Sequence, residues 1–480
     1  MSADVTPGTV EWQLFDCVQV NLAVLADRWH GPGTHLDLGA VLRFRPRPGP
    51  GGLPTVERSA ADQLTESAQR LGLTVLDLRT TRAGEPVVPA AGRCVVADAY
   101  HLPWVPYFGR RHMDHSFLLE PADGADALVV DGYHNDTPWG AARPVGRPLS
   151  RAELAAAVPG PALSVTLAPA AGPVAPAGAA LDLADEEAAG RYVTAYAEHP
   201  DRLAALDRLT LETWLLARSR KLHVRFLRSR GLLADGTAAL AHVKAWESLA
   251  ESVYLGYRRV ERGRPEPGEL FTRLARQLDR DREVFGPGTA TGTPATGAAG
   301  ATGTTGAAEA AEAAEAAGAD AARTAEPDTA GRADTASATR PTPATPRHQE
   351  ASGPDTPPRT PPAGADPART AEPGGAGEGT PVPGALRERV AASAGAVLRT
   401  DPAALLDGRP LADVPGFTSF RVVEIVERLE RELSVEFVAD DLVPENLHHV
   451  DGICRIVLRA LPTGTTAPHP ARPVARTGGN

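Results

Sequence analysis

Short apolar runs alternate with turn residues over the first third of the chain, and this alternation predicts a series of short β-strands. Two longer runs, 17–29 and 60–71, instead repeat their apolar residues at helical spacing. The mixture is typical of an α+β domain, which we place at about residues 10–169. The predicted strands are 39–44, 74–78, 93–99, 117–120, 127–130 and 163–167.

A helical pattern follows and continues over residues 180–285. Most of its segments are long enough to pack as a small bundle on the first domain, so this region is a predicted helical subdomain. Trp214, Trp246 and Tyr254 stand at helical spacing from neighbouring Leu and Val residues, which predicts that they belong to the core of the bundle. The predicted helices are 184–199, 202–230, 236–262 and 267–284.

The apolar pattern stops over residues 286–383, which are nearly all Ala, Gly, Thr, Pro, Glu and Asp. A segment without aromatic residues and with few large aliphatic ones cannot bury a core, so we expect a disordered linker. A flexible chain of this length has a root-mean-square span on the order of 50–60 Å. The linker would therefore let a domain on one side reach sites on the other. The tail 463–480 is also predicted to be disordered.

A second helical pattern occupies residues 384–462, with predicted helices at 386–398, 421–437 and 450–461. The run 421–437 is amphipathic, and Ser419 stands directly ahead of it. One face of this run is apolar and the opposite face is acidic, as in a helix that packs on a core and presents carboxylates. The apolar face carries Val422, Val426, Leu429 and Leu433, and the acidic face carries Glu424, Glu427, Glu430 and Glu432.

A serine at the start of an acidic helix in such a segment resembles the attachment site of an acyl carrier protein. The resemblance implies an all-α four-helix bundle, with 4'-phosphopantetheine attached to Ser419 by a phosphopantetheinyl transferase. Carriers of this type usually have Asp-Ser-Leu, whereas this chain has Thr418-Ser419-Phe420. Phe420 keeps an apolar anchor, but Thr418 lacks the carboxylate. Two alternatives are that Ser419 only caps the helix and that the carrier never receives the arm.

Composition and charge narrow the classes of function. The 480 residues suggest two or three domains, and the net charge of −11 without a long basic run argues against nucleic-acid binding. Cys17, Cys94 and Cys454 lie far apart, which argues against a disulfide framework or structural zinc. No apolar run reaches membrane-spanning length and the first residues lack a signal-peptide pattern, so we expect a soluble, cytoplasmic protein.

Cys17 is the candidate nucleophile of the first domain. It follows Asp16 at the start of the predicted helix 17–29. The unsatisfied N–H groups and the dipole at a helix N-terminus favour a thiolate, which is the reactive form of cysteine. Cys94 and Cys454 stand within apolar runs and are predicted to be small core residues.

His115 and Asp131 are the candidate partners of Cys17. The turn 121–126 separates two apolar runs, and a hairpin centred near Asp123 pairs residues whose numbers sum to 246. His115 would then lie directly opposite Asp131, with Cβ atoms about 5 Å apart. A cysteine, a histidine and an aspartate placed in this way form a nucleophilic triad. Alternatives for the two partners are His112 or His134, and Asp126 or Asp136.

The first domain also resembles a known family. Its cysteine helix is similar to that of papain-like cysteine peptidases, and the runs 95–104, 115–117 and 131–136 resemble the BtrH-type N-terminal domain of butirosin biosynthesis. The resemblance implies a papain-like fold and transfer of an acyl group from a carrier-protein thioester to an amine. In papain-like enzymes a glutamine before the cysteine contributes to the oxyanion hole. Gln13 is the candidate here, although it lies closer to Cys17 than the usual spacing.

Together, the two resemblances imply a cysteine-dependent acyltransferase of secondary-metabolite biosynthesis that carries its own carrier domain. Its partners would be a small-molecule amine acceptor and an acyl-loading synthetase or other carrier proteins, with neither nucleic acid nor membrane involved. Aromatic residues of a Pro-rich loop could line an acyl channel. The alternatives are a thioesterase that hydrolyses carrier thioesters and a non-enzymatic carrier or scaffold. The channel candidates are Tyr100, Trp104, Tyr107 and Phe108.

Overall fold

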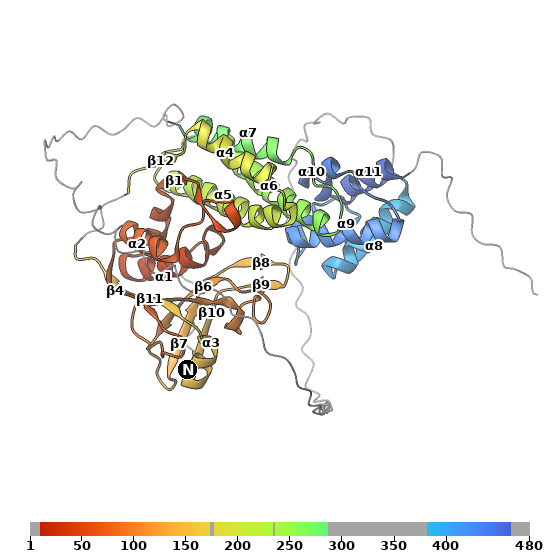
Figure 1. Ribbon diagram of the computed structural model, residues 1–480. Helices are drawn as coiled ribbons and strands as arrows, with labels where there is room; N and C mark the ends of the chain where they lie inside the picture. Colours follow the sequence, from red (N-terminus) through yellow and green to blue (C-terminus); the bar gives the residue numbers. More distant parts are fainter. Residues whose placement is uncertain (1–9, 173–176, 234–235, 287–381, 462–480) are drawn as a thin grey trace, which may run out of the picture. The chain divides into compact units, whose positions relative to one another are not determined.

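The computed structural model of the chain describes residues 10–172, 177–233, 236–286 and 382–461. These residues form a mixed α+β region followed by helices, and a separate helical region at the C-terminal end (Figure 1). The predicted tail and all but the ends of the predicted linker lie outside the described residues. Within the described residues, no helix has the length and apolar character needed to cross a membrane.

The main sheet is antiparallel and has six strands in the order β10-β7-β6-β5-β11-β4. Helices α1 (Cys17–His30) and α2 (Ala60–Arg70) pack on it and against each other, and one apolar cluster joins their buried residues to the strands. Helix α1 is therefore held in place by its packing on the sheet. Its strands are β4 (Leu73–Thr81), β5 (Arg93–Asp98), β6 (Asp114–Glu120), β7 (Ala127–Asp131), β10 (Val145–Leu149) and β11 (Ala162–Pro169).

Five of the six predicted strands lie in this sheet as β4, β5, β6, β7 and β11, and both predicted helices of this region are confirmed. The sixth is β1 (Val41–Phe44), which leaves the sheet and pairs in parallel with β12 (Ala180–Leu183). The second region therefore begins with a strand and is not helical throughout. The sequence pattern missed several short elements: β2 (Arg47–Pro48), β3 (Pro54–Thr55), β8 (Asn135–Thr137), β9 (Gly140–Ala142), β10 and α3 (Arg151–Ala157).

Four long helices follow β12 and pack on one another (Figure 1). They confirm the predicted helices to within a few residues at each end. Their apolar residues share clusters with β1, and α5 also contacts the 3-10 helix Thr34–Gly39 that precedes β1. The bundle is thus built onto the first region, as expected. The helices are α4 (Glu186–Ala197), α5 (Arg202–Ser229), α6 (Thr237–Glu261) and α7 (Leu270–Phe285).

The C-terminal region surrounds its own apolar cluster. Its acidic helix is α9 (Ser419–Leu433), which begins at Ser419 itself. The Thr418 side chain caps this helix by accepting a hydrogen bond from the N–H of Arg421 at 3.2 Å. The alternative in which Ser419 is the N-cap is therefore wrong, because Thr418 holds that position. The other α-helices described here are α8 (Gly384–Leu398), α10 (Pro444–Leu447) and α11 (Val450–Ala460).

Candidate active site at Cys17

Cys17 is the first residue of α1, as predicted, and it is partly exposed. Asp16 caps the helix, because its carboxylate accepts a hydrogen bond of 2.8 Å from the N–H of Gln19. Gln63 of α2 donates a second hydrogen bond to Asp16. The cap fixes the first turn of α1, and its N–H groups point toward the thiol end of the helix. The local sequence alone therefore places the thiol where a helix favours negative charge.

His115 and Asp131 form a buried pair beside Cys17. The Nε2 of His115 lies 2.7 Å from Oδ2 of Asp131, and the two side chains are 1% and 3% exposed. The other ring nitrogen, Nδ1, is then left for the thiol. A carboxylate that holds one nitrogen of an imidazole orients the ring and fixes its tautomer. Cys17, His115 and Asp131 have the connectivity of a nucleophile, a base and an orienting group.

The hairpin register differs from the predicted one by two residues. Strands β6 and β7 pair Leu118 with Val130 and Leu119 with Val129, so residue numbers sum to 248 rather than 246. A shift of two keeps every side chain on its predicted face. His115 and Asp131 are therefore diagonal neighbours instead of directly opposed, and long side chains reach each other across that diagonal.

Two further donors hold the Asp131 carboxylate. The indole N–H of Trp104 lies 3.1 Å from Oδ2, and the backbone N–H of Tyr133 lies 2.9 Å from Oδ1. A buried carboxylate needs such partners to remain charged. Gly132 stands between the two residues at a close approach, because a Cβ there would lie 2.8 Å from the ring of Trp12. The Asp-Gly-Tyr segment is thus fixed in place by its surroundings.

Asn21 ties the nucleophile's helix to the strands that carry the pair. Its buried amide donates to the carbonyl oxygens of Cys17 and Ser116 at 3.0 and 2.8 Å. Its oxygen accepts from the N–H of Gly132 at 3.0 Å. One side chain therefore contacts all three segments of the site. These hydrogen bonds hold the three segments in a fixed arrangement.

The electrostatic setting of His115 favours the imidazolium form. Burial alone would lower its pKa, but the charge and hydrogen bond of Asp131, together with the contact to Cys17, outweigh it and raise the pKa to about 10. At neutral pH the site therefore holds a protonated imidazole beside a thiol. An imidazolium stabilises a neighbouring thiolate and can later give its proton to a leaving group.

The other candidate histidines and aspartates lie elsewhere. His112 is exposed and pairs with Asp98 at 2.6 Å, while Asp136 pairs with Arg143 at 2.7 Å. Asp126 accepts a hydrogen bond from the N–H of Arg151 at the start of α3. None of these pairs contacts Cys17 in the described part of the chain. His134 is half-buried, and its pKa is lowered by burial.

A cleft of about 510 Å³ opens beside Cys17. Residues from α1, α2, β1, α5 and α6 line it, so the helical region contributes one wall. Arg218 of α5 reaches the loop before Cys17 and donates to the carbonyl oxygens of Phe15 and His134. Its guanidinium lies over the ring of Trp214 at 4.2 Å. The lining also includes aromatic residues: Tyr107, Tyr133, Trp139, Trp214, Tyr254, Tyr257 and Phe420.

Of the predicted channel residues, Tyr107 lines the cleft. Phe108 is exposed, Tyr100 stacks on His112, and Trp104 contacts Asp131 from the side. Gln13 is exposed in the short 3-10 helix before α1 and is not among the residues that line the cleft. Gln19, on the first turn of α1, does line it.

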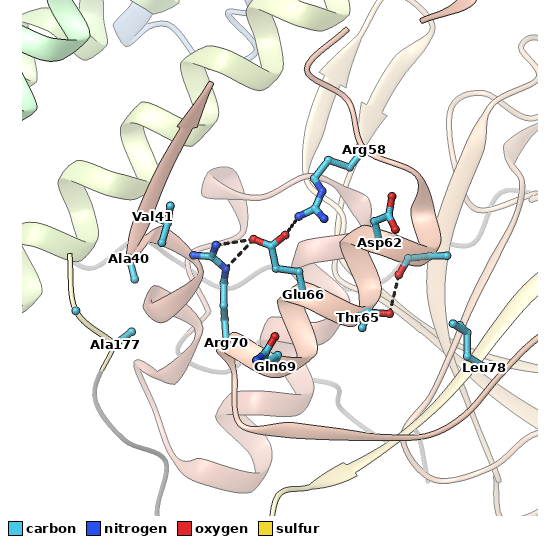
Figure 2. A pocket seen from close by; sticks show the side chains of 12 residues that line it. Ala40, Val41, Arg58, Asp62, Thr65, Glu66, Gln69, Arg70, Leu78 and Ala177 are labelled. Atoms are coloured by element: carbon cyan, nitrogen blue, oxygen red, sulfur yellow. Dashed lines mark hydrogen bonds and ion pairs between the residues drawn. The ribbon is translucent and has the colours of Figure 1, made fainter. Parts of the chain in front are cut away.

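A second cavity of about 720 Å³ lies against the outer side of α2 (Figure 2). Arg58 and Arg70 both point to Glu66 across it, and Arg43 reaches the same carboxylate at 2.8 Å. Val41 and these charged residues also line the cleft at Cys17, so the two hollows share a wall. These arginines are already paired with the carboxylate of Glu66. We therefore interpret the charged residues of this cavity as ion pairs that stabilise α2.

Sequence reasoning missed several residues of the site. Asn21 and Arg218 act through contacts with segments far away in the sequence, and no local pattern marks them. Trp104 was predicted as a channel residue, and its hydrogen bond to Asp131 is a different role. Trp214 and Tyr254 were predicted as bundle core, and both line the cleft; Tyr254 is also buried, as predicted, and Trp246 is fully buried, as predicted. Cys94 and Cys454 are buried, and desolvation raises the pKa of each, to about 12 and about 11.

The described residues contain no group of three or more His, Cys, Asp or Glu side chains arranged to hold a metal ion. The arrangement instead places a partly exposed thiol beside a buried His–Asp pair, a combination of groups that can support nucleophilic catalysis. Comparison with known proteins adds no relative: no protein-family model and no curated protein matches this chain.

Proposed function

We propose that this protein is a cysteine acyltransferase that takes an acyl group from a carrier-protein thioester and passes it to an amine. The observation that carries the proposal is the buried His115–Asp131 pair beside the N-terminal end of the Cys17 helix, where Cys17 itself lines an aromatic cleft. A buried imidazole that is locked to a carboxylate and faces a partly exposed thiol has the parts needed for nucleophilic catalysis.

Ser419 is the proposed attachment site of a phosphopantetheine arm. It is the first residue of α9, next to the Thr418 cap and ahead of an acidic helix, which supports the carrier-like interpretation. The positive end of a helix also suits the phosphate through which such an arm is attached. When bound, the arm supplies the acyl group as a thioester, which is activated toward a thiol nucleophile.

In the first step the Cys17 thiolate attacks the thioester carbonyl carbon. The new bond joins that carbon to Sγ of Cys17, and the bond to the departing sulfur breaks. His115 gives its proton to the departing thiolate, so charge and atoms balance. Asp131 keeps the imidazole oriented throughout. Exchange between two thioesters is nearly isoenergetic, so little driving force is needed.

In the second step an amine attacks the acyl-cysteine. His115, now neutral, accepts a proton from the amine as the C–N bond forms, and the Cys17 thiolate leaves. The product is an amide, and the imidazolium–thiolate pair is restored. Because an amide is more stable than a thioester, this step makes the overall transfer favourable.

Intact-protein mass spectrometry can test the proposal. The full chain is treated with a phosphopantetheinyl transferase and an acyl-coenzyme A, and then with a panel of amines. We expect the acyl mass to load through Ser419, to appear on Cys17 and to leave with the amine. Cys17→Ala should load normally and release nothing. Equal release from Cys17→Ala would contradict the proposal and indicate a docking module, while release to water alone would indicate a thioesterase.

A further inference from the structure

The C-terminal region contacts the helical region through a charged surface. The described residues of both regions belong to one compact unit. On the α6 side, arginines cluster at the end of the helix and just beyond it. On the other side, the acidic helix α9 supplies two of its glutamates. We define the docking surface by its charged members: Arg258, Arg259, Arg262 and Arg264 on one side, and Glu427 and Glu430 on the other.

Each of the two glutamates forms ion pairs with two arginines. Glu427 lies 3.3 Å from Arg258 and 2.5 Å from Arg262. Glu430 pairs with Arg264 and lies 3.7 Å from Arg259, with only 5% of its side chain exposed. Of these pairs, Arg259–Glu430 is buried on both sides, and such a pair is screened less by salt than an exposed one. The charges are complementary, and such complementarity selects one orientation of docking.

The four glutamates predicted on the acidic face of α9 do not behave alike. Glu424 pairs with Arg421 of its own helix, and Glu432 pairs with Arg428 and accepts from Ser393, all within the C-terminal region. Only Glu427 and Glu430 are directed to α6. The acidic face is therefore divided between internal contacts and docking, and Glu424 offers a matched control for Glu427.

An apolar contact accompanies the charges and leads to the Cys17 cleft. The ring of Phe420 meets Tyr254 of α6 edge-on at 4.6 Å, and Tyr254 belongs to the same apolar cluster as the C-terminal core. Phe420 and Tyr254 both line the cleft that Cys17 lines. Ser419 directly precedes Phe420, and adjacent Cα atoms are about 3.8 Å apart. The residue that follows the proposed attachment site therefore lines the cleft.

Backbone groups extend the contact on the other side of α9. Arg259 donates to the carbonyl oxygen of Phe437 at 3.3 Å. The N–H of Gly268, in the turn after α6, donates to Asp440 at 3.1 Å. These contacts involve the loop that follows α9 as well as the helix, so they fix the rotation of α9 on α6 and not only its position.

We propose that the donor for Cys17 is the carrier region of the same chain, docked through the surface defined above. This inference rests on the proposed function and decides which carrier supplies the acyl group. Delivery within one chain replaces a bimolecular encounter by an intramolecular one, at an effective concentration in about the millimolar range. The acyl group moves from the arm sulfur to Sγ of Cys17, and the released thiolate takes the proton of His115.

Single-turnover measurements on full-length chains test this. Acylation of Cys17 from loaded Ser419 should be first order and independent of protein concentration. Glu427→Arg should slow it by about tenfold, since a like charge at a docking site disfavours association, whereas Glu424→Arg should change it less than twofold. Combining Glu427→Arg with Arg258→Glu and Arg262→Glu should restore most of the rate. Equal rates for Glu427→Arg and Glu424→Arg would overturn the inference.

A mixing experiment distinguishes a failure of this inference from a failure of the proposed function. Loaded Cys17→Ala chain is mixed at micromolar concentration with Ser419→Ala chain, so that transfer must occur between molecules. We expect a rate far below that of the wild type and proportional to concentration. If the mixture matched the wild type, the chain's own carrier would not be the preferred donor. Absence of transfer in every arrangement, including wild type, would instead reject the proposed function.

Amide hydrogen exchange tests the docking surface without requiring acyl transfer. Glu427→Arg should increase amide exchange in the last turns of α6, near Tyr254 and Arg262, and Glu424→Arg should not. Unchanged exchange in both variants would reject the docking surface even if acyl transfer occurs.

Discussion

Two of the buried His–Asp pairs in the described part of the chain lie in different regions of this protein, and their surroundings differ. In the sheet region, His115 lies 2.7 Å from Asp131; in the helical region, His242 of α6 lies 2.8 Å from Asp281 of α7. All four side chains are at most 3% exposed. Neither distance nor burial therefore distinguishes a site of chemistry from a structural pair.

The distinction lies in what else each pair contacts. Arg220 shares the carboxylate of Asp281, and burial, which would raise the pKa of Asp281, is outweighed by Arg220 and His242, so that this pKa is lowered. The second ring nitrogen of His242 has no hydrogen-bond partner among the described residues. His115 instead interacts with the side chain of Cys17, which lines the cleft. One pair joins two helices, and the other lies beside a thiol.

Replacing each of the two aspartates by asparagine should give the largest difference in activity between the two pairs. Asp131→Asn removes the charge that keeps His115 protonated and oriented, so we expect the rate of Cys17 acylation to fall on the order of 10³- to 10⁴-fold. Asp281→Asn should leave the rate per folded molecule within about twofold of wild type. The rates come from single-turnover mass spectrometry. A comparable loss in both variants would mean that the pairs do not differ in function.

The order should be reversed for stability: Asp281→Asn should lose more unfolding free energy than Asp131→Asn. Asp281→Asn leaves the buried guanidinium of Arg220 without its counter-charge, and such losses cost about 3–5 kcal/mol of unfolding free energy. Asp131 faces a neutral indole and a backbone N–H besides His115, so Asp131→Asn should cost less. Urea unfolding followed by circular dichroism measures both. Equal destabilisation would argue against a structural role specific to Asp281.

The elevated pKa of His115 predicts how the acylation of Cys17 depends on pH. Because that pKa is raised to about 10, the imidazolium persists through neutral pH and is lost as pH rises toward 10. Its contribution to stability is full below the ordinary value of about 6.5 and disappears over the same rise. Acylation of Cys17 should therefore be level from about pH 7 to 9 and decline near pH 10. In Asp131→Asn the decline should begin at lower pH, since the largest contribution that opposes burial is then removed.

The sequence predicted the local parts of the site well and the long-range parts less so. Cys17 was placed at a helix start by its own neighbours, Asp16 and the apolar repeat of α1. The meeting of His115 with Asp131 was predicted through a register that was wrong by two residues. It still held, because a slip of two preserves the face of each side chain.

Other features could not be predicted from local pattern. Strand β1 resembles its neighbours in sequence, yet it pairs with β12 and packs with residues of the later helices. The roles of Asn21 and Trp104 depend on strands that are distant in sequence. The spacing of Tyr254 is that of a core residue, and its position in the cleft is set by the contact with Phe420.

The smallest expected effect concerns the indoles beside each pair. Trp104 donates to Asp131 at 3.1 Å, and Trp246 donates to Asp281 at 3.2 Å. Trp104→Phe removes one hydrogen bond to a charged group, worth about 1.5 kcal/mol, so acylation of Cys17 should slow by about tenfold. The Asp131 carboxylate would turn more freely, and the ring of His115 with it.

Trp246→Phe is the matched control, and it should lower the unfolding free energy by about 1 kcal/mol while leaving the acylation rate within twofold of wild type. Both variants keep an aromatic ring in place, so packing changes little. If Trp104→Phe affected stability alone, as expected for Trp246→Phe, the hydrogen bonds around Asp131 would not serve the chemistry of Cys17. The two His–Asp pairs would then differ only in whether a thiol stands beside them.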